Sequence, residues 1–381
     1  MKNIYWRPRA VSRTALILIA VGSLVGLALV ENLKIIQHRP YHDQKMAASE
    51  LAAQAMERIY YARLETGVTI DVSTDPTQSG MIGVPMSPVT SISGALSAKQ
   101  TSVNPNFAAV VVEMLRRAGV ETGDLVAVGC SGSFPALNIC VYAAMETLEA
   151  KPIVISSAAA SQWGANVPEL LWLDMERILH KEGIFKTRSV ATSIGGYEDR
   201  GLGMTDEGHQ LLAEGIQRNQ IEELKANTFE ESIEDRLKLI RRRAGRKPIK
   251  AYINIGGGTV SIGRSLGKKL YDPGLNLRPP RHISRVDGVA PRLGEDGVPV
   301  IHLVQVVELA QRYGLPVAPI VFPEVGEADV FSGKDYNDLL VSITLALIVI
   351  SLYGFIRSDV GFRLLRVGTL KKDRGHLEPM V

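Results

Sequence analysis

A glycine- and serine-rich turn at residues 129–133 is the stretch of this chain best suited to chemistry. Its sequence, GCSGS, follows an apolar β-branched run that ends at Val128, and Pro135 then opens a largely apolar helix. Glycines let a ligand approach the backbone closely, and the unpaired N–H groups at a helix start favour anions. The turn also comes within one residue of the G-x-S-x-G nucleophile elbow, with Ser133 in place of the last glycine. Three interpretations stay open: a structural βα turn, an anion or carboxylate cradle, and a nucleophile at Ser131.

Three further apolar runs end in turns that are rich in glycine or hydroxyl groups, after Ile155, Ala191 and Ile255. Strands that alternate with helices predict a mostly parallel sheet, whose turns meet at the carboxyl ends of the strands, where ligands bind. The alternative is four ordinary loops that need glycine for their geometry. The candidate ligand-binding residues in these turns are Gly129, Gly132, Ser133, Ser156, Ser157, Asn166, Gly195, Gly196, Arg200, Gly256, Gly257, Gly258 and Thr259.

Two residues outside the first turn complete the candidate site. Lys99 lies in a polar segment before an apolar helix, where a lysine beside hydroxyl and amide groups either binds an anion or is solvated next to a helix cap. His209 follows a glycine-rich turn and is a candidate catalytic residue, and the other possible bases for a serine nucleophile are His180, His282, His302 and Lys99. A serine–histidine–carboxylate triad is recognised only by geometry, so the sequence leaves catalysis open.

Several classes of function are disfavoured. The formal net charge of +3 is too small to indicate a nucleic-acid surface. Gly256 to Gly258 lack the lysine that a phosphate-binding P-loop needs, and the histidines are scattered without an H-E-x-x-H motif. No cofactor and no metal are therefore expected. Cys130 and Cys140 have no metal-ligand spacing, and we expect two free, mostly buried thiols.

Two uncharged apolar runs, residues 14–30 and 339–356, are predicted to be transmembrane helices. Basic residues lie on the terminal side of each run, which by the positive-inside rule places both termini in the cytoplasm and the middle of the chain outside it. A cleaved signal peptide is the alternative for the first run, and a core helix is the alternative for the second.

The predicted fold class is α/β, with an open, mostly parallel, Rossmann-like sheet and flanking helices, plus the two transmembrane helices. The predicted organisation is a cytoplasmic N-terminus (1–13), the first span (14–30), a stalk helix and loop region (31–98), an extracytoplasmic α/β domain (99–325), an acidic linker (326–338), the second span (339–356) and a basic cytoplasmic tail (357–381).

Long stretches of the chain resemble the membrane-anchored family called poly-gamma-glutamate system protein. The resemblance covers most of the sequence, and it is carried by KQTSVNPNFAAVVVEMLRRAGV (99–120), VAVGCSGSFPALN (126–138), ISSAAASQWGANVPELLWLDME (155–176), SIGGYEDRGLGMTDEG (193–208) and NIGGGTVSIG (254–263). It implies a pathway, capsule biosynthesis and export of poly-γ-glutamate, but no catalytic residues.

The expected function is therefore that of an accessory protein that binds the anionic polymer or assembles the synthase. Its implied partners are poly-γ-glutamate, the membrane subunits of the synthase and export complex, and the lipid bilayer, with no nucleic acid. The alternative is a serine-type hydrolase or transferase that acts on the γ-amide bonds of the polymer, with Ser131 as the nucleophile.

Overall fold

The structure is a computed structural model that describes residues 13–264 and 266–357 of the chain. Its described residues divide into two compact units, one formed by residues 38–332 and the other by residues 13–37 with residues 333–357. The larger unit is α/β, and the smaller one is built mainly from two helices.

A six-stranded mixed sheet forms the centre of the larger unit. Five strands are parallel, and the edge strand β8 runs antiparallel to β9. The strand order is β6 (Ala191–Ser193), β3 (Lys151–Ser157), β2 (Leu125–Ser131), β7 (Ile249–Ile255), β9 (Val300–Leu303) and β8 (Gly274–Asn276). Each of the four apolar runs singled out in the sequence contributes a parallel strand, so their turns leave the sheet at the same edge.

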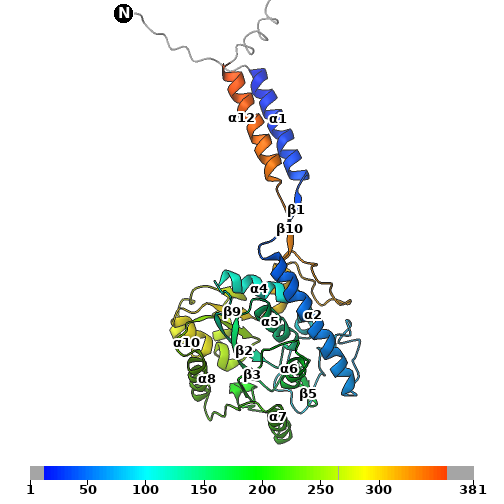
Figure 1. The fold of residues 1–381 in the computed structure, drawn as a ribbon, viewed down its shortest axis with the longest axis vertical. Helices are drawn as coiled ribbons and strands as arrows, with labels where there is room; N and C mark the ends of the chain where they lie inside the picture. The colour runs from blue at the N-terminus through cyan, green and yellow to red at the C-terminus, as the bar shows by residue number, and fades with distance from the viewer. Residues whose placement is uncertain (1–12, 265, 358–381) are drawn as a thin grey trace, which may run out of the picture. The chain divides into compact units, whose positions relative to one another are not determined.

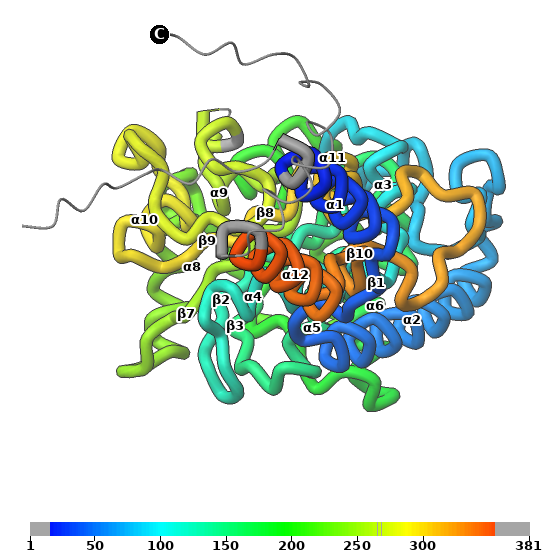
Figure 2. The backbone as a smooth tube through the Cα atoms, turned by 90° about the horizontal axis from the view of Figure 1, so that it is seen from above, coloured from blue at the N-terminus to red at the C-terminus, as the bar shows by residue number. Residues whose placement is uncertain are grey.

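Helices cover both faces of the sheet (Figures 1 and 2). Side chains alternate along each strand, so Val126 and Val128 enter one hydrophobic cluster while Leu125 and Ala127 enter the other. The helices on the first face are α2 (His42–Glu65), α4 (Phe107–Arg117), α5 (Pro135–Thr147) and α6 (Trp172–Lys181), and those on the second are α8 (Phe229–Ala244) and α10 (Val289–Glu295).

The remaining elements of the larger unit connect these layers. They are α3 (Leu96–Ser102), the hairpin strands β4 (Asn166–Val167) and β5 (Leu170–Leu171), the 3-10 turn η1 (Tyr197–Asp199), α7 (Asp206–Asn219), α9 (Thr259–Ile262), η2 (Gly267–Lys269), η3 (Ile283–Arg285) and α11 (Val306–Arg312).

The helix that the sequence predicts as a stalk is α2, and it belongs to the larger unit. Ala48, Ala52, Ala55 and Ile59 recur every three or four residues and are fully buried. Their small side chains let α2 lie against α4 and α5, which are its main neighbours.

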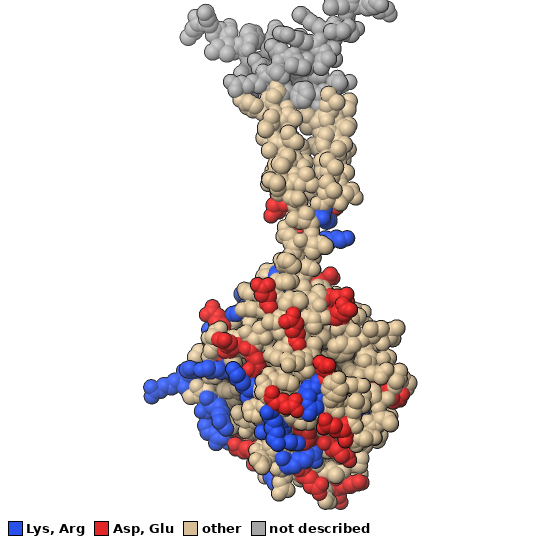
Figure 3. Space-filling model, turned by 45° about the vertical axis from the view of Figure 1, so that its right-hand side comes forward, with Lys and Arg blue, Asp and Glu red and all other residues tan. Residues whose placement is uncertain are grey.

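The smaller unit contains α1 (Arg13–Asn32), α12 (Asp338–Arg357) and most of the paired strands β1 (Ile35–His38) and β10 (Ser332–Asp335), of which only His38 and Ser332 belong to the larger unit. The two helices pack together, and a Cβ at Gly26 would lie only 2.5 Å from Cγ2 of Thr344. On the face seen in Figure 3, their shafts present neither Lys or Arg nor Asp or Glu beyond the charged residues at the end nearest β1 and β10.

The predicted membrane topology is nevertheless wrong. Within the described residues, no helix combines the length and the apolar character needed to cross a membrane. Charged residues bound both apolar runs, Arg13 and Glu31 the first and Asp338 and Arg357 the second. The two transmembrane helices, the two-pass membrane location and the extracytoplasmic placement of the middle of the chain are corrected accordingly. The basic segments 1–12 and 358–381 lie outside the described residues.

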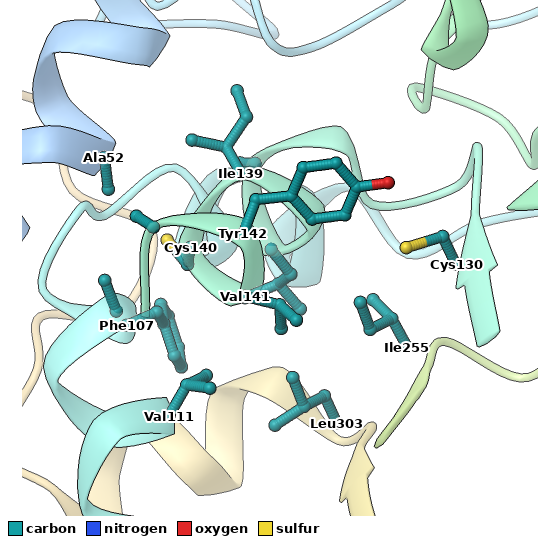
Figure 4. Close-up of a cluster of buried hydrophobic side chains, with 14 of the residues drawn as sticks. Ala52, Phe107, Val111, Cys130, Ile139, Cys140, Val141, Tyr142, Ile255 and Leu303 are labelled. Atoms are coloured by element: carbon teal, nitrogen blue, oxygen red, sulfur yellow. The ribbon is translucent and has the colours of Figure 1, made fainter. Parts of the chain in front are cut away.

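The two cysteines are free and buried, as the sequence predicts. Cys130 lies at the end of β2 and Cys140 lies within α5, on opposite sides of Tyr142 in the view of Figure 4. Loss of solvation raises the pKa of both thiols, which leaves little thiolate at neutral pH.

We therefore expect neither cysteine of the native protein to react with a bulky disulfide reagent at pH 8, and both to react after denaturation. The absorbance of the released thiolate measures the reaction. Rapid labelling of the native protein would contradict the buried placement of these side chains.

Candidate functional site

The turns after β2, β3 and β7, together with η1 after β6, surround one cavity of about 360 Å³. The loop of residues 91–95 and α3 close it from the other side. Nine of the residues singled out in the sequence line this cavity: Lys99, Gly129, Ser131, Ser133, Ser157, Gly196, Gly257, Gly258 and Thr259. The parallel topology is what brings segments so distant in the sequence to the same place.

Gly129 shows why one of these turns needs glycine. A Cβ at this position would lie 2.6 Å from Oη of Tyr252 and 3.1 Å from Oγ of Ser261, both of which are side-chain oxygens. The two hydroxyl groups hydrogen-bond each other at 2.5 Å, and Ser261 lines the cavity. The glycine therefore makes room for a polar part of the cavity wall.

Other candidate residues lie away from the cavity. Ser156 is buried in the first hydrophobic face, where its Oγ lies 2.6 Å from Oγ of Ser189. Asn166 is also buried, and its amide bridges to Val84 and Thr90. These two residues stabilise the fold. Gly132, Gly195 and Gly256 lie beside the lining residues without contributing to the wall, and the last two have positive φ angles.

Arg200 and His209 line a second, more open cavity. His209 Nε2 lies 3.1 Å from the carbonyl oxygen of Gly201, so this nitrogen donates to the backbone. Ser131 Oγ accepts a hydrogen bond from the backbone N–H of Ser133 at 3.2 Å. No histidine lines the first cavity within the described part of the chain, so the structure does not bring Ser131 and His209 together.

Lys99 is the most unusual side chain in the cavity. The residue is 3% exposed, and its Nζ donates to the carbonyl oxygen of Ser133 and to Oγ of Ser161, the latter at 2.9 Å. The ammonium group also lies 3.8 Å from the centre of the Phe134 ring. In the described residues no carboxylate forms an ion pair with it, and burial lowers the pKa of Lys99 to about 7.

Two buried oxygen atoms of other residues that line the cavity have no hydrogen-bond partner among the described residues. They are Oδ1 of Asn254 and Oγ1 of Thr259. The amide nitrogen of Asn254 donates to the carbonyl oxygen of Gly256 at 2.6 Å and to Nδ1 of His302 at 2.9 Å, which fixes the orientation of the amide. A buried acceptor without a donor costs free energy, and a ligand donor in the cavity would supply the missing bond.

Two further cations line the cavity, but both have carboxylate partners. Arg236 is buried and forms an ion pair with Asp199 at 2.8 Å. Arg264 is 53% exposed and forms one with Glu198 at 2.8 Å. Lys99 is therefore the cavity cation, among the described residues, whose charge no carboxylate balances.

Sequence patterns miss several residues of the cavity wall. Ser161 belongs to the hydroxyl- and alanine-rich segment after β3, but nothing in that segment separates it from its neighbours. Three more residues of the wall have no sequence pattern that distinguishes them from ordinary helix, core or strand residues. They are Phe134, Arg236 and Asn254, and only the fold shows that they line the cavity. In the described chain, no cluster of His, Cys, Asp or Glu is suited to hold a metal ion.

No protein-family model matches this chain, and no curated protein matches it in sequence.

Proposed function

We propose that the α/β unit binds a carboxylate-bearing ligand in this cavity, with the carboxylate on Nζ of Lys99. The observation that supports this most strongly is that the ammonium group is buried and that no carboxylate of the described chain forms an ion pair with it. A cation in such an environment gains most when an anion arrives, because charge-assisted hydrogen bonds are about twice as strong as neutral ones.

The ligand that we propose is the end of a γ-linked glutamyl chain. Each γ-glutamyl unit offers a carboxylate for Lys99 and an amide N–H that the free oxygen of Asn254 or Thr259 would accept. The cavity volume is at the small end of the range for ligand pockets, about 300–1,000 Å³, which favours a chain end over a long segment. The resemblance to the poly-gamma-glutamate system protein family supports the same polymer.

In this proposal the protein is an accessory factor that holds poly-γ-glutamate beside the subunits that make and export it. The geometry gives no support to Ser131 with His209 as a catalytic pair, since they line different cavities.

Isothermal titration calorimetry with γ-glutamyl-glutamate tests the proposal. At pH 6, where Lys99 is protonated, we expect saturable binding of one ligand per chain, and no binding of the same compound with its carboxylates converted to amides. Equal heats for the two compounds, or no binding of either, would contradict the proposal.

A further inference from the structure

One hydroxyl group in the cavity, that of Ser161, is hydrogen-bonded to Lys99, which forms no ion pair within the described residues. Ser161 Oγ lies 2.9 Å from Lys99 Nζ, and both residues line the cavity while being at least nine-tenths buried. The backbone N–H of Ser161 donates to Oγ of Ser133 at 3.0 Å, and Lys99 also donates to the carbonyl oxygen of Ser133. Ser133 thus holds both members of the pair in place.

Ser131 and Ser133, at the end of β2 and in the turn after it, do not share this arrangement. Ser131 Oγ and Ser133 Oγ each accept a hydrogen bond from a backbone N–H group, and neither is bonded to Lys99 within the described residues. Among these hydroxyls, Ser161 is therefore the one placed to lose its proton to the amine.

The environment also suits Lys99 for accepting a proton. No carboxylate holds its charge, and burial lowers its pKa to about 7, so a large fraction of the amine is neutral near neutral pH. A general base works best when its pKa is near the working pH, and a lysine of this kind activates a neighbouring hydroxyl group.

We propose that Ser161 and Lys99 form a nucleophile and base pair that hydrolyses an amide bond of a carboxylate-bearing peptide bound in the cavity. This inference rests on the proposed function, because it assigns chemistry to the same cavity and the same ligand class.

The step balances with water as the only co-reactant. Ser161 Oγ attacks the amide carbon while its proton passes to Nζ of Lys99. The C–N bond then breaks, and the leaving nitrogen takes the proton from Lys99, which leaves an ester on Ser161. Water attacks this ester and gives a proton to Lys99; the C–O bond breaks, and Ser161 recovers its proton from Lys99.

The product of this reaction explains how Lys99 can both act as a base and bind a carboxylate. Cleavage converts the amide carbonyl into a carboxylic acid beside Nζ, and its ionisation leaves a carboxylate next to a protonated Lys99. The proposed reaction therefore ends in a complex of the same kind as that of the proposed function, with the newly formed γ-carboxylate on Lys99.

Access to the pair depends on a residue without a side chain. A Cβ at Gly94 would lie 3.2 Å from Oγ of Ser161 and 2.6 Å from the carbonyl oxygen of Gln162. Gly94 belongs to the loop that forms part of the cavity wall, so its missing side chain leaves space beside the nucleophile.

The test uses the full chain and oligomers of γ-linked glutamate, with release of free amine as the readout. We expect Ser161→Ala to reduce turnover by about 1,000-fold or more and Lys99→Arg to reduce it by about 100-fold or more, because arginine keeps the cation but is not a base. The matched control is Ser97→Ala, an exposed hydroxyl on α3, which we expect to leave turnover unchanged. In the wild type, turnover rises with pH through about 7 as Lys99 loses its proton.

A fluorophosphonate probe with peptide mapping identifies the nucleophile independently of the natural substrate. We expect one adduct, on Ser161. Labelling of Ser131 instead, or no turnover and no adduct in a protein that still binds γ-glutamyl-glutamate, would overturn the inference and leave the proposed function standing. Turnover and labelling at Ser161 without binding of γ-glutamyl-glutamate would overturn the proposed function and leave the nucleophile and base pair standing.

Discussion

Replacing Lys99 with Met is expected to weaken binding of γ-glutamyl-glutamate at pH 6 by about 10- to 100-fold. A hydrogen bond to a charged group contributes about 1.5–3 kcal/mol, and this substitution removes the one cavity cation, in the described chain, that lacks a carboxylate partner. Calorimetry on the wild type and the variant measures the loss.

The effect of Lys99→Met on ligand affinity can be distinguished from its effect on the stability of the fold. Methionine has a similar length and needs no solvation, so we expect the free energy of unfolding at pH 6 to stay the same or to rise when the buried charge is removed. Lys151→Met, an exposed lysine at the start of β3, is the matched control and is expected to change neither quantity. Unchanged affinity in a folded Lys99→Met protein would refute the assignment of the carboxylate to this lysine.

Replacing Asp199 with Ala is expected to reduce the free energy of unfolding by about 3–5 kcal/mol. The side chains of Asp199 and Arg236 are each 8% exposed, and Arg236 Nη2 donates to both carboxylate oxygens, at 2.9 and 2.8 Å. Ser193 and Ser232 donate to the same carboxylate, each at 2.6 Å. Removing one partner of a buried ion pair leaves the other charge uncompensated, which is the costly case.

Urea denaturation measures this effect, and two further variants make it specific. Glu198→Ala breaks the more exposed pair with Arg264 and is expected to cost less than about 1 kcal/mol. Adding Arg236→Met to Asp199→Ala removes the orphaned charge and is expected to restore part of the lost stability. If Asp199→Ala and Glu198→Ala were equally stable, the buried ion pair between Asp199 and Arg236 would not be what stabilises this part of the cavity wall.

The sequence predicts the α/β core well because its signals are local. Short β-branched runs bounded by glycine specify β2 and β7, and Pro135 marks the start of α5. The parallel order of the strands follows from the intervening helices, and it implies that the glycine turns meet at one edge. Residues 91–95, which belong to the predicted loop region before Lys99, also line the cavity.

The chemistry of the cavity depends on contacts that no local pattern encodes. Lys99 reaches Ser161 across 62 positions of the chain, and both are bound to Ser133 from a third segment. His209 follows a turn of the same type as the others, but its helix carries it to a different cavity. The membrane prediction failed for a different reason: it was made from apolar composition, and no helix of the described residues combines the length and the apolar character that a span needs.

The most direct test of the account is the protonation of Lys99 itself. Nuclear magnetic resonance of lysine labelled with ¹³C and ¹⁵N, with Lys99→Met to assign the signal, follows the side chain across a pH titration. We expect a pKa of about 7 in the free protein. Saturating γ-glutamyl-glutamate is expected to raise that pKa, because the carboxylate binds the protonated amine in preference to the neutral one. An ordinary lysine pKa of about 10.4 that the ligand leaves unchanged would contradict the account.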